Sequence, residues 1–364
     1  MQTIIMWIMA LGAVLGGFDY LFGNRMGLGK RFEEGFSLLG PTALSMTGIL
    51  CLSPLLAKLL TKAVVPLWGR LGLDPGMLGG LLAIDMGGYQ LATALAQNAS
   101  IGRYSGIVIA ATLGCTLTFT IPVGTGLLPA EDRPVFGRGI VIGLCVLPLG
   151  IILGGLLCEI TLRELLRQSL PVIVLSLPLA GGMFFFPQKM GRGFAAFAGF
   201  IRALSVLGLI LGTVEYLTGW AVLPGLMPIG EAMQTVSAIG IVMLGSLPSA
   251  ELLQRVLKRP LDWLGRRTGL NQASLTGLLV GGVSVLPALT LFPQMDKRGK
   301  LVNGAFLVGA ASALAAHLGF TFAVDRAMVP ALLAAKFTAG FGAAIIAVNI
   351  KRIRVLHSKI IQNG

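Results

Sequence analysis

Acidic side chains inside otherwise apolar segments are the residues of this sequence best suited to chemistry. Asp85 is the foremost of them, because it lies in the run Asp-Met-Gly-Gly-Tyr-Gln within a long apolar stretch. A charge at the centre of a membrane helix costs at least about 2.5–3.5 kcal/mol, so it usually marks a solute pathway, a proton relay or a paired site. Asp85 could therefore bind a cationic solute, or it could cap a broken helix or pair with a basic residue.

Four further acids lie at the ends of apolar segments. Asp19 and Glu215 each follow a Gly-xxx-Gly pair on the same helix face, and such faces let helices approach closely. Both acids should therefore face the bundle interior, in a solute pathway or in the scaffold. Glu34 and Glu231 precede apolar runs, where a carboxylate can complement a helix N-terminus or line a pathway.

Two basic side chains also fall inside apolar segments. His317, in the run His-Leu-Gly-Phe-Thr, could change protonation near neutral pH or donate a hydrogen bond to a polar solute; a packing role is the alternative. Lys336 is expected to form a salt bridge or to extend toward the membrane surface. The four cysteines have no CxxC spacing, which favours small buried or lipid-facing residues over disulfides and metal ligands.

The elements that position these residues must be membrane helices. The chain is 55% hydrophobic and 12% charged, with a mean hydropathy of +0.86, whereas soluble domains carry about 25% charged residues. At about 20 apolar residues per span, its length allows roughly ten membrane segments and little else. We therefore predict one all-α polytopic transmembrane domain over residues 1–364.

Composition and motifs also exclude other classes of protein. The net charge of +13 comes from Lys and Arg in short loops, which fix membrane orientation and meet anionic lipid headgroups. A nucleic-acid partner is not expected, since no base-stacking motif accompanies these charges. The sequence holds no HExxH or GxSxG motif, and its two histidines are too few for a rich metal site. A membrane-embedded enzyme stays the less favoured alternative to a transporter.

The chain is predicted to be duplicated. Its apolar segments lie at about 2–22, 35–57, 76–96, 104–127, 137–158, 169–187, 197–219, 232–250, 272–292, 302–323 and 328–350. Residues from Glu34 align without a gap onto residues from Glu231, and Arg70 matches Arg267. Asp85 aligns with Gly282, so duplication does not account for this acid. The predicted boundaries are 1–160 for repeat 1, 161–196 for a linker span, 197–350 for repeat 2 and 351–364 for a basic cytoplasmic tail.

The distribution of Lys and Arg indicates how the halves are oriented. If all eleven segments cross, the basic residues divide almost evenly between the two sides, which membrane proteins avoid. Suppose instead that segments 76–96 and 272–292 enter and leave the membrane on the same face. Twenty basic residues then lie on one side of the membrane, and the other side has seven: Lys58, Lys62, Arg70, Arg103, Arg163, Arg167 and Arg326. We therefore predict nine crossings and two re-entrant hairpins, with inverted halves and eleven crossings as the alternative.

This arrangement also predicts a location and an orientation. The side rich in Lys and Arg should be cytoplasmic, which places the N-terminus outside and the C-terminus in the cytoplasm of a cell with a bacterial-type inner membrane. The first apolar segment has no basic residue before Arg25 and is interpreted as an uncleaved span. The apolar, glycine-rich surface is compatible with lipid contact and with a homo-oligomer.

Five short motifs carry a resemblance to a known family. They are Phe32-Glu-Glu-Gly-Phe36, Asp85-Met-Gly-Gly88, Glu215-Tyr-Leu-Thr-Gly219, Met295-Asp-Lys-Arg-Gly-Lys300 and His317-Leu-Gly-Phe-Thr321. In this order, over nearly the whole chain, they resemble the ethanolamine permease family of bacterial ethanolamine-utilisation operons (EutH type). The resemblance implies uptake of ethanolamine through the inner membrane, without a cofactor. Ala316, Val283-Ser284 and Gln294 depart from the family pattern and leave a related amino alcohol open as substrate.

The resemblance also suggests how such a substrate is recognised. Ethanolamine offers a primary ammonium, similar to that of lysine with its pKa of about 10.4, and one hydroxyl. Asp85 suits the ammonium. The candidate substrate-binding residues are Asp85, Tyr89, Gln90, Ser284, His317 and Thr321. The alternative is an ion-coupled carrier of a small organic anion, which would bind at the N-termini of the hairpin helices.

Overall fold

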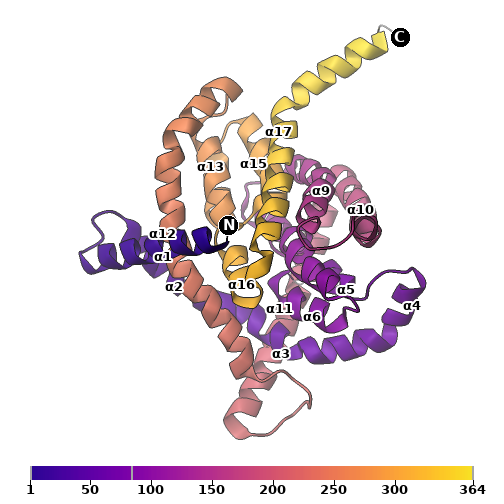
Figure 1. The fold of residues 1–364 in the computed structure, drawn as a ribbon. Helices are drawn as coiled ribbons and strands as arrows, with labels where there is room; N and C mark the ends of the chain where they lie inside the picture. Colours follow the sequence, from indigo (N-terminus) through magenta and orange to yellow (C-terminus); the bar gives the residue numbers. More distant parts are fainter. Residues whose placement is uncertain (1, 83–84, 363–364) are drawn as a thin grey trace.

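The computed structural model describes residues 2–82 and 85–362, and this part of the chain folds into helices joined by short connections (Figure 1). Up to the middle of the chain the elements are α1 (Gln2–Leu21), α2 (Leu28–Ser37), α3 (Leu39–Ala63), α4 (Val65–Arg70), α5 (Met77–Leu81), η1 (Asp85–Gly87), α6 (Gly88–Leu95), α7 (Ala99–Arg103), the π-helices η2 (Tyr104–Gly114) and η3 (Thr116–Thr120), α8 (Ile121–Leu127), α9 (Arg133–Gly155) and α10 (Leu162–Phe185). The remaining elements are α11 (Pro187–Thr218), α12 (Ile229–Thr268), α13 (Gln272–Val283), α14 (Val285–Leu291), η4 (Phe292–Gln294), α15 (Lys297–Ala310), α16 (Ala316–Val324), η5 (Arg326–Met328) and α17 (Val329–Gln362).

The helices confirm an all-α membrane protein. Within the described residues, eight helical segments are long and apolar enough to cross a membrane: Thr3–Leu21, Leu28–Ala63, Ala99–Leu127, Arg133–Gly155, Leu162–Phe185, Pro187–Thr218, Ile229–Leu257 and Arg326–Ile350. They coincide with eight of the nine crossings expected from the sequence. The ninth, 302–323, falls on α15 and α16, which residues 311–315 separate. The expected basic tail, 351–364, continues α17 as far as Gln362, and its side chains lie outside the described part of the chain.

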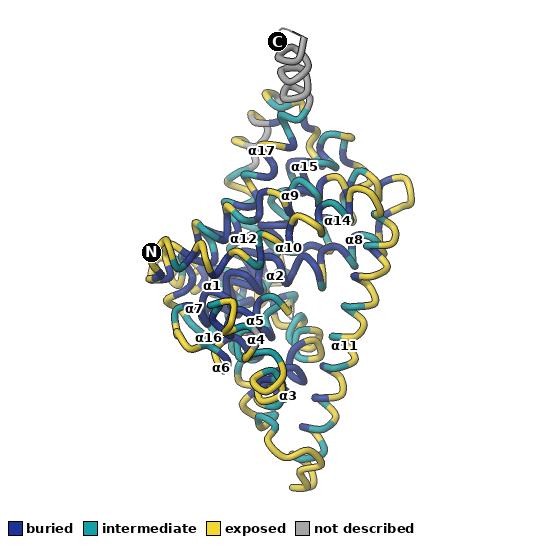
Figure 2. Tube along the Cα trace, turned by 90° about the vertical axis from the view of Figure 1, so that its right-hand side faces the viewer, coloured by how far each residue is buried: buried dark blue, intermediate teal, exposed yellow. Residues whose placement is uncertain are grey.

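The core of the molecule lies where α9, α15 and α17 pack against one another (Figure 2). The α9–α17 contact depends on a small residue, because a Cβ on Gly150 would lie 2.5 Å from the Ala335 carbonyl oxygen. By contrast, α11 runs along one edge in Figure 2 with mostly exposed residues. Its exposed side chains include Phe200, Leu207 and Ile210, which suits contact with lipid tails.

The first long helix of each predicted half packs on a helix of the other, through the glycine faces that the sequence indicated. Gly12 of α1 lies against α12, where an added Cβ would be 2.5 Å from the Gly245 carbonyl oxygen. Likewise, a Cβ on Gly208 of α11 would lie 2.2 Å from the Gly48 carbonyl oxygen of α3. These close approaches hold the halves together without bulky side chains between them.

A carboxylate joins the two ends of the segment that contains α5 and α6. Asp74, which is 6% exposed, accepts hydrogen bonds from the backbone N–H groups of Gly76 (2.7 Å), Asn98 (2.8 Å) and Gln97 (3.3 Å). The start and the end of the segment with α5 and α6 are therefore adjacent in space. The helix α6 has eight residues, about 12 Å at 1.5 Å per residue, which is short of a hydrocarbon core about 30 Å thick.

The segment with α13 and α14 is joined in the same way, but from its other end. Asp296 accepts hydrogen bonds from the Asn271 N–H (3.0 Å), the Ser274 hydroxyl (2.7 Å), the Gly299 N–H (3.0 Å) and the Arg298 N–H (3.1 Å). Burial by itself would raise the pKa of Asp296, but these hydrogen bonds outweigh it and hold the pKa below its usual value. The carboxylate therefore stays ionised and keeps the segment ends together.

Candidate functional site

Asp85 lies at the break between α5 and α6, as its glycine-rich surroundings predicted. It opens the 3₁₀ turn η1, directly after residues 83–84, which lie outside the described part of the chain. Its φ is +55°, in the left-handed region that a non-glycine residue adopts at some cost, with Asp and Asn the most tolerant. Strained backbone of this kind persists where the surrounding structure holds it and often marks a functional position.

A second break brings an element of the other half to Asp85. The chain is unwound between α15 and α16, where the N–H groups of Ser312 and Leu314 donate to the carbonyls of Gly281 (3.1 Å) and Gly282 (2.8 Å) at the end of α13. The irregular backbone is thus satisfied by protein, as it must be at membrane depth. His317 is the second residue of the helix that restarts there.

Asp85 and His317 form a hydrogen-bonded pair across the two halves. The distance from Nε2 of His317 to Oδ1 of Asp85 is 2.9 Å. The histidine side chain is 2% exposed and that of the aspartate 23%. Nε2 bears the proton if the ring is neutral and donates to the ionised carboxylate, so Asp85 retains its second oxygen for another donor. This pair joins two residues that the sequence singled out separately.

Cys115 lies beside the pair. The ligand atoms of Asp85, Cys115 and His317 are all within 4.8 Å of one another. Around a tetrahedral zinc ion with bonds of about 2.0 Å, nitrogen and oxygen ligands lie roughly 3.3 Å apart. Because the Asp85–His317 distance is shorter, at 2.9 Å, the geometry favours a direct hydrogen bond. The ammonium of Lys336, which interacts electrostatically with Asp85 and His317, also opposes a divalent cation here.

Lys336 differs from what its sequence context suggested. Its side chain is 0% exposed, so it does not extend to the membrane surface, and no carboxylate of the described residues lies within salt-bridge distance of its nitrogen. Nζ instead donates to the Ala111 carbonyl of η2 at 2.5 Å. The expectation was wrong because the backbone of the neighbouring π-helix, rather than an acid, supplies the acceptor.

Several buried polar atoms of these and neighbouring helices have no hydrogen-bond partner among the described residues. They are Oε1 of Gln90, Oγ1 of Thr120, Nδ1 of His317 and Oγ1 of Thr321. Thr321 follows His317 by one helical turn on α16, and Tyr89 packs edge-on against Phe320 of the same helix, with ring centroids 6.0 Å apart. Because buried polar groups are normally paired, unpartnered ones on the helices that carry Asp85 and His317 are suited to a small polar ligand.

The other sequence candidates lie elsewhere or lack a contact with the pair. Ser284 forms the break between α13 and α14, with extended backbone, and Pro287 follows inside α14. Asp19 caps α2 by accepting hydrogen bonds from the N–H groups of Met26, Leu28 and Gly29, each at 2.8 Å. This contact fits a role in the scaffold, one of the two roles that the sequence left open for this acid.

The remaining acids are also placed. Glu34 pairs with the exposed Arg31 at 2.8 Å, and Glu231 lies in the first turn of α12 as expected. Glu215 is half-buried near the end of α11, where the adjacent Gly212 packs toward Cys51 and Ile229. These positions give none of the three a contact with Asp85 or His317 among the described residues.

Two ion pairs that the sequence did not reveal connect residues of the two predicted halves. Arg103, at the end of α7, pairs with Asp325 at 2.5 Å, and Lys300 of α15 pairs with Asp132 at 2.5 Å. Arg103 and Lys300 are equivalent in the sequence duplication, and each acid lies just before the last long helix of the opposite half. The equivalence of Arg103 and Lys300, together with the acids in the loops, could have indicated these two ion pairs from the sequence.

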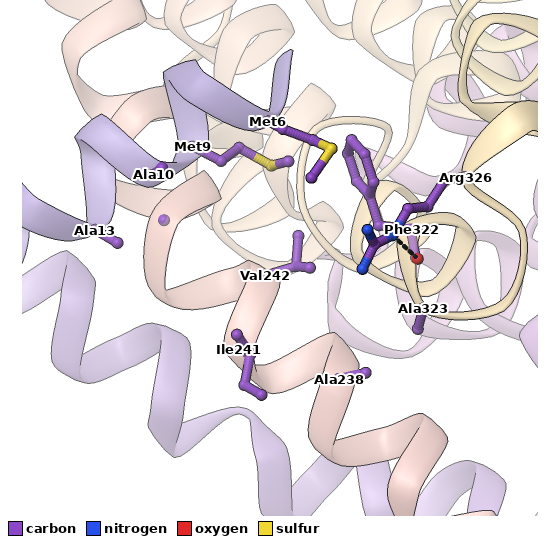
Figure 3. Close-up of a pocket in the computed structure, with 11 residues that line it drawn as sticks. Met6, Met9, Ala10, Ala13, Ala238, Ile241, Val242, Phe322, Ala323 and Arg326 are labelled. Carbon is purple, nitrogen blue, oxygen red and sulfur yellow. Dashed lines mark hydrogen bonds between the residues drawn. The ribbon is translucent and has the colours of Figure 1, made fainter. Parts of the chain in front are cut away.

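Two cavities of the structure are separate from this pair. One of about 360 Å³ lies between α1, α12 and α16; Figure 3 shows Met6, Met9 and Val242 around it, with Arg326 hydrogen-bonded to the Phe322 carbonyl. Another of about 510 Å³ is bordered by α8, α9, α10 and α11. Asp85 and His317 line neither cavity.

Comparison with known proteins agrees with the resemblance. A family model described as "Ethanolamine utilisation protein, EutH" matches residues 1–350. The "Probable ethanolamine permease EutH" of Listeria monocytogenes is 34% identical over 95% of this chain and 93% of its own length, and that of Escherichia coli K12 is 35% identical over 96% and 95%. "Uncharacterized protein YxeR" of Bacillus subtilis is 35% identical over 94% and 93%. No solved structure matches the chain. The chain therefore belongs to the EutH family of ethanolamine utilisation proteins.

Proposed function

We propose that this protein is a membrane transporter that imports ethanolamine or a closely related amino alcohol. The observation that carries the proposal is the Asp85–His317 pair, which a broken segment of one half and a broken helix of the other bring together at 2.9 Å. Relatives along almost the whole chain bear the name ethanolamine permease. The family assignment and the eight apolar helices favour transport over an enzymatic role.

The chemistry of the pair suits a small amino alcohol. The free oxygen of Asp85 can accept a hydrogen bond from the substrate ammonium in a charge-assisted contact. The substrate hydroxyl can both donate and accept, and the unpartnered atoms of Gln90, His317 and Thr321 offer both kinds of partner. Tyr89 and Phe320 supply apolar contact for the two methylene groups. Ser284 completes the proposed set from the second broken segment.

Uptake by proteoliposomes tests this function. We expect the purified protein to take up radiolabelled ethanolamine, with competition by unlabelled amino alcohols. Small carboxylates should not compete, because Asp85 repels them. Protein-free liposomes give the background diffusion of the neutral amine. Competition by carboxylates alone would instead support the organic-anion carrier, and chemical conversion of ethanolamine in detergent would support the enzyme.

We also propose that the chain is an inverted repeat of two halves, 1–160 and 197–350, with two re-entrant hairpins. The hydrogen bonds of Asp74 and Asp296 support this arrangement, because they keep the start and end of each hairpin together. Arg103 and Lys300 are equivalent in the predicted duplication, and each pairs with an acid that precedes the last long helix of the opposite half, as expected for a pseudo-two-fold relation. In this topology the two pairs lie toward opposite membrane faces, with α10 as the linking span.

Cysteine accessibility tests the topology. In a background without the native thiols, cysteines at Lys62 and Arg103 should react with a membrane-impermeant maleimide added from outside, and one at Lys300 only after permeabilisation. The seven-to-twenty division of basic residues predicts this, with the N-terminus outside and the C-terminus in the cytoplasm. Opposite accessibility of positions 62 and 103 would indicate eleven crossings instead.

A further inference from the structure

Lys336 is the most unusual charged residue of the core. Its ammonium has three N–H donors, is 0% exposed, and has one hydrogen-bond acceptor among the described residues, the Ala111 carbonyl at 2.5 Å. A buried ammonium is stable only when it is well paired. With a single neutral acceptor, the charged form is weakly supported and depends on the negative charge of its surroundings.

Duplication does not account for this lysine. The equivalent residue of the first half is Arg138, which is exposed near the start of α9. Lys336 lies in the first part of α17, a helix that packs against α9, α15 and η2. A residue buried at such cost in one half only is a candidate for a function of the site rather than of the scaffold.

The ionisable groups that interact with Lys336 are those of the candidate site. They are Asp85 of η1, Cys115 between the two π-helices and His317 of α16, each of which interacts electrostatically with Lys336. No ionisable group of the described residues of α9 or α15 belongs to the groups that interact with Lys336. If Cys115 and His317 are neutral, Asp85 and an ionised Lys336 leave the empty site with no net charge.

A cationic substrate changes this balance. Its ammonium needs the carboxylate of Asp85, the one acid among the described groups that interact with Lys336, and places a second positive charge beside this lysine. The site would then hold two cations and one anion. Loss of a proton by one of the cations restores neutrality, and Lys336 is the less well paired of the two because it has only the Ala111 carbonyl.

We propose that Lys336 is a built-in exchangeable cation, which releases one proton to water for each substrate ammonium that binds at Asp85. One N–H bond of the ammonium breaks, the electron pair stays on Nζ, and water accepts the proton. The bound state has the substrate as a cation, Asp85 as an anion and Lys336 as a neutral amine. Transport is then an electroneutral exchange of ammonium for proton that requires no sodium ion. This inference rests on the proposed function.

Proton release on binding tests the proposal. Ethanolamine is added to the purified protein in weakly buffered detergent at pH 7, with a pH indicator dye for protons and calorimetry for bound substrate. We expect about one proton released per substrate bound. In Lys336→Met we expect binding without release. Lys62→Met, at an exposed lysine of α3, should release as the wild type does.

The outcomes separate this inference from the function on which it rests. No binding of ethanolamine would overturn the proposed function itself. Binding without proton release by the wild type would overturn only the exchange. Release that persists in Lys336→Met would assign the proton to the amine or to His317 and also overturn it. If Lys336→Met does not fold, Lys336→Arg serves instead, because its permanent charge should abolish release and weaken binding at least tenfold.

Discussion

Replacing Asp85 with asparagine is expected to lower ethanolamine uptake by tenfold or more, while the protein remains folded in the membrane. Asparagine keeps the shape of the side chain, still accepts from Nε2 of His317, and tolerates the left-handed backbone at this position as well as aspartate does. It removes only the charge. Since about 1.4 kcal/mol corresponds to a tenfold change in affinity, even a modest charge-assisted contact with the substrate ammonium would produce this loss.

The measurement compares initial uptake rates in proteoliposomes of equal protein content, with thermal unfolding of each variant in detergent. Glu159→Gln is the matched control, because it makes the same change at an exposed acid outside the site, and it should transport as the wild type does. Wild-type uptake by Asp85→Asn would refute the charge role. A parallel loss of uptake and folded protein would point to a structural carboxylate.

Individual residues of the site were predictable from the sequence, whereas their partners were not. A carboxylate and a histidine inside apolar segments stand out because their insertion is costly, and the structure brings the two side chains into contact. Their contact spans 232 positions along the chain, and nothing in a single sequence states which acid meets which base. Duplication did not help, since Asp85 aligns with Gly282 and His317 belongs to the other half.

The contacts of Lys336 and Asp19 were hard to predict for the same physical reason: both depend on where backbone groups lie. Lys336 was expected to pair with an acid or to extend to the membrane surface. Its ammonium instead donates to a backbone carbonyl of a π-helix, and a backbone acceptor cannot be recognised from residue types. Asp19 was equally ambiguous, because a cap depends on where the following turn directs its N–H groups. Local spacing could predict the glycine contacts of α1 and α11, since helix periodicity alone determines those faces.

No role was predicted from the sequence for Asp74, which lies at the start of the segment with α5 and α6. Its replacement by alanine is the second change for which we expect a large effect. Asp74→Ala removes three hydrogen bonds from backbone N–H groups to a carboxylate that is 6% exposed. Bonds to charged groups contribute about 1.5–3 kcal/mol each, and the donors would be left unsatisfied. We expect a loss of at least about 3 kcal/mol of stability, seen as a thermal midpoint lower by about 5 °C or more.

Uptake should fall as well, because the ends of the hairpin would separate and Asp85 at its tip would lose its position opposite His317. Asp74→Asn retains one acceptor oxygen and should be intermediate in both stability and uptake. Glu131→Ala, at an exposed acid before α9, should change neither. An unchanged thermal midpoint in Asp74→Ala would show that the hairpin is held by packing alone. Normal uptake despite a lowered midpoint would show that the position of Asp85 does not depend on the hairpin ends.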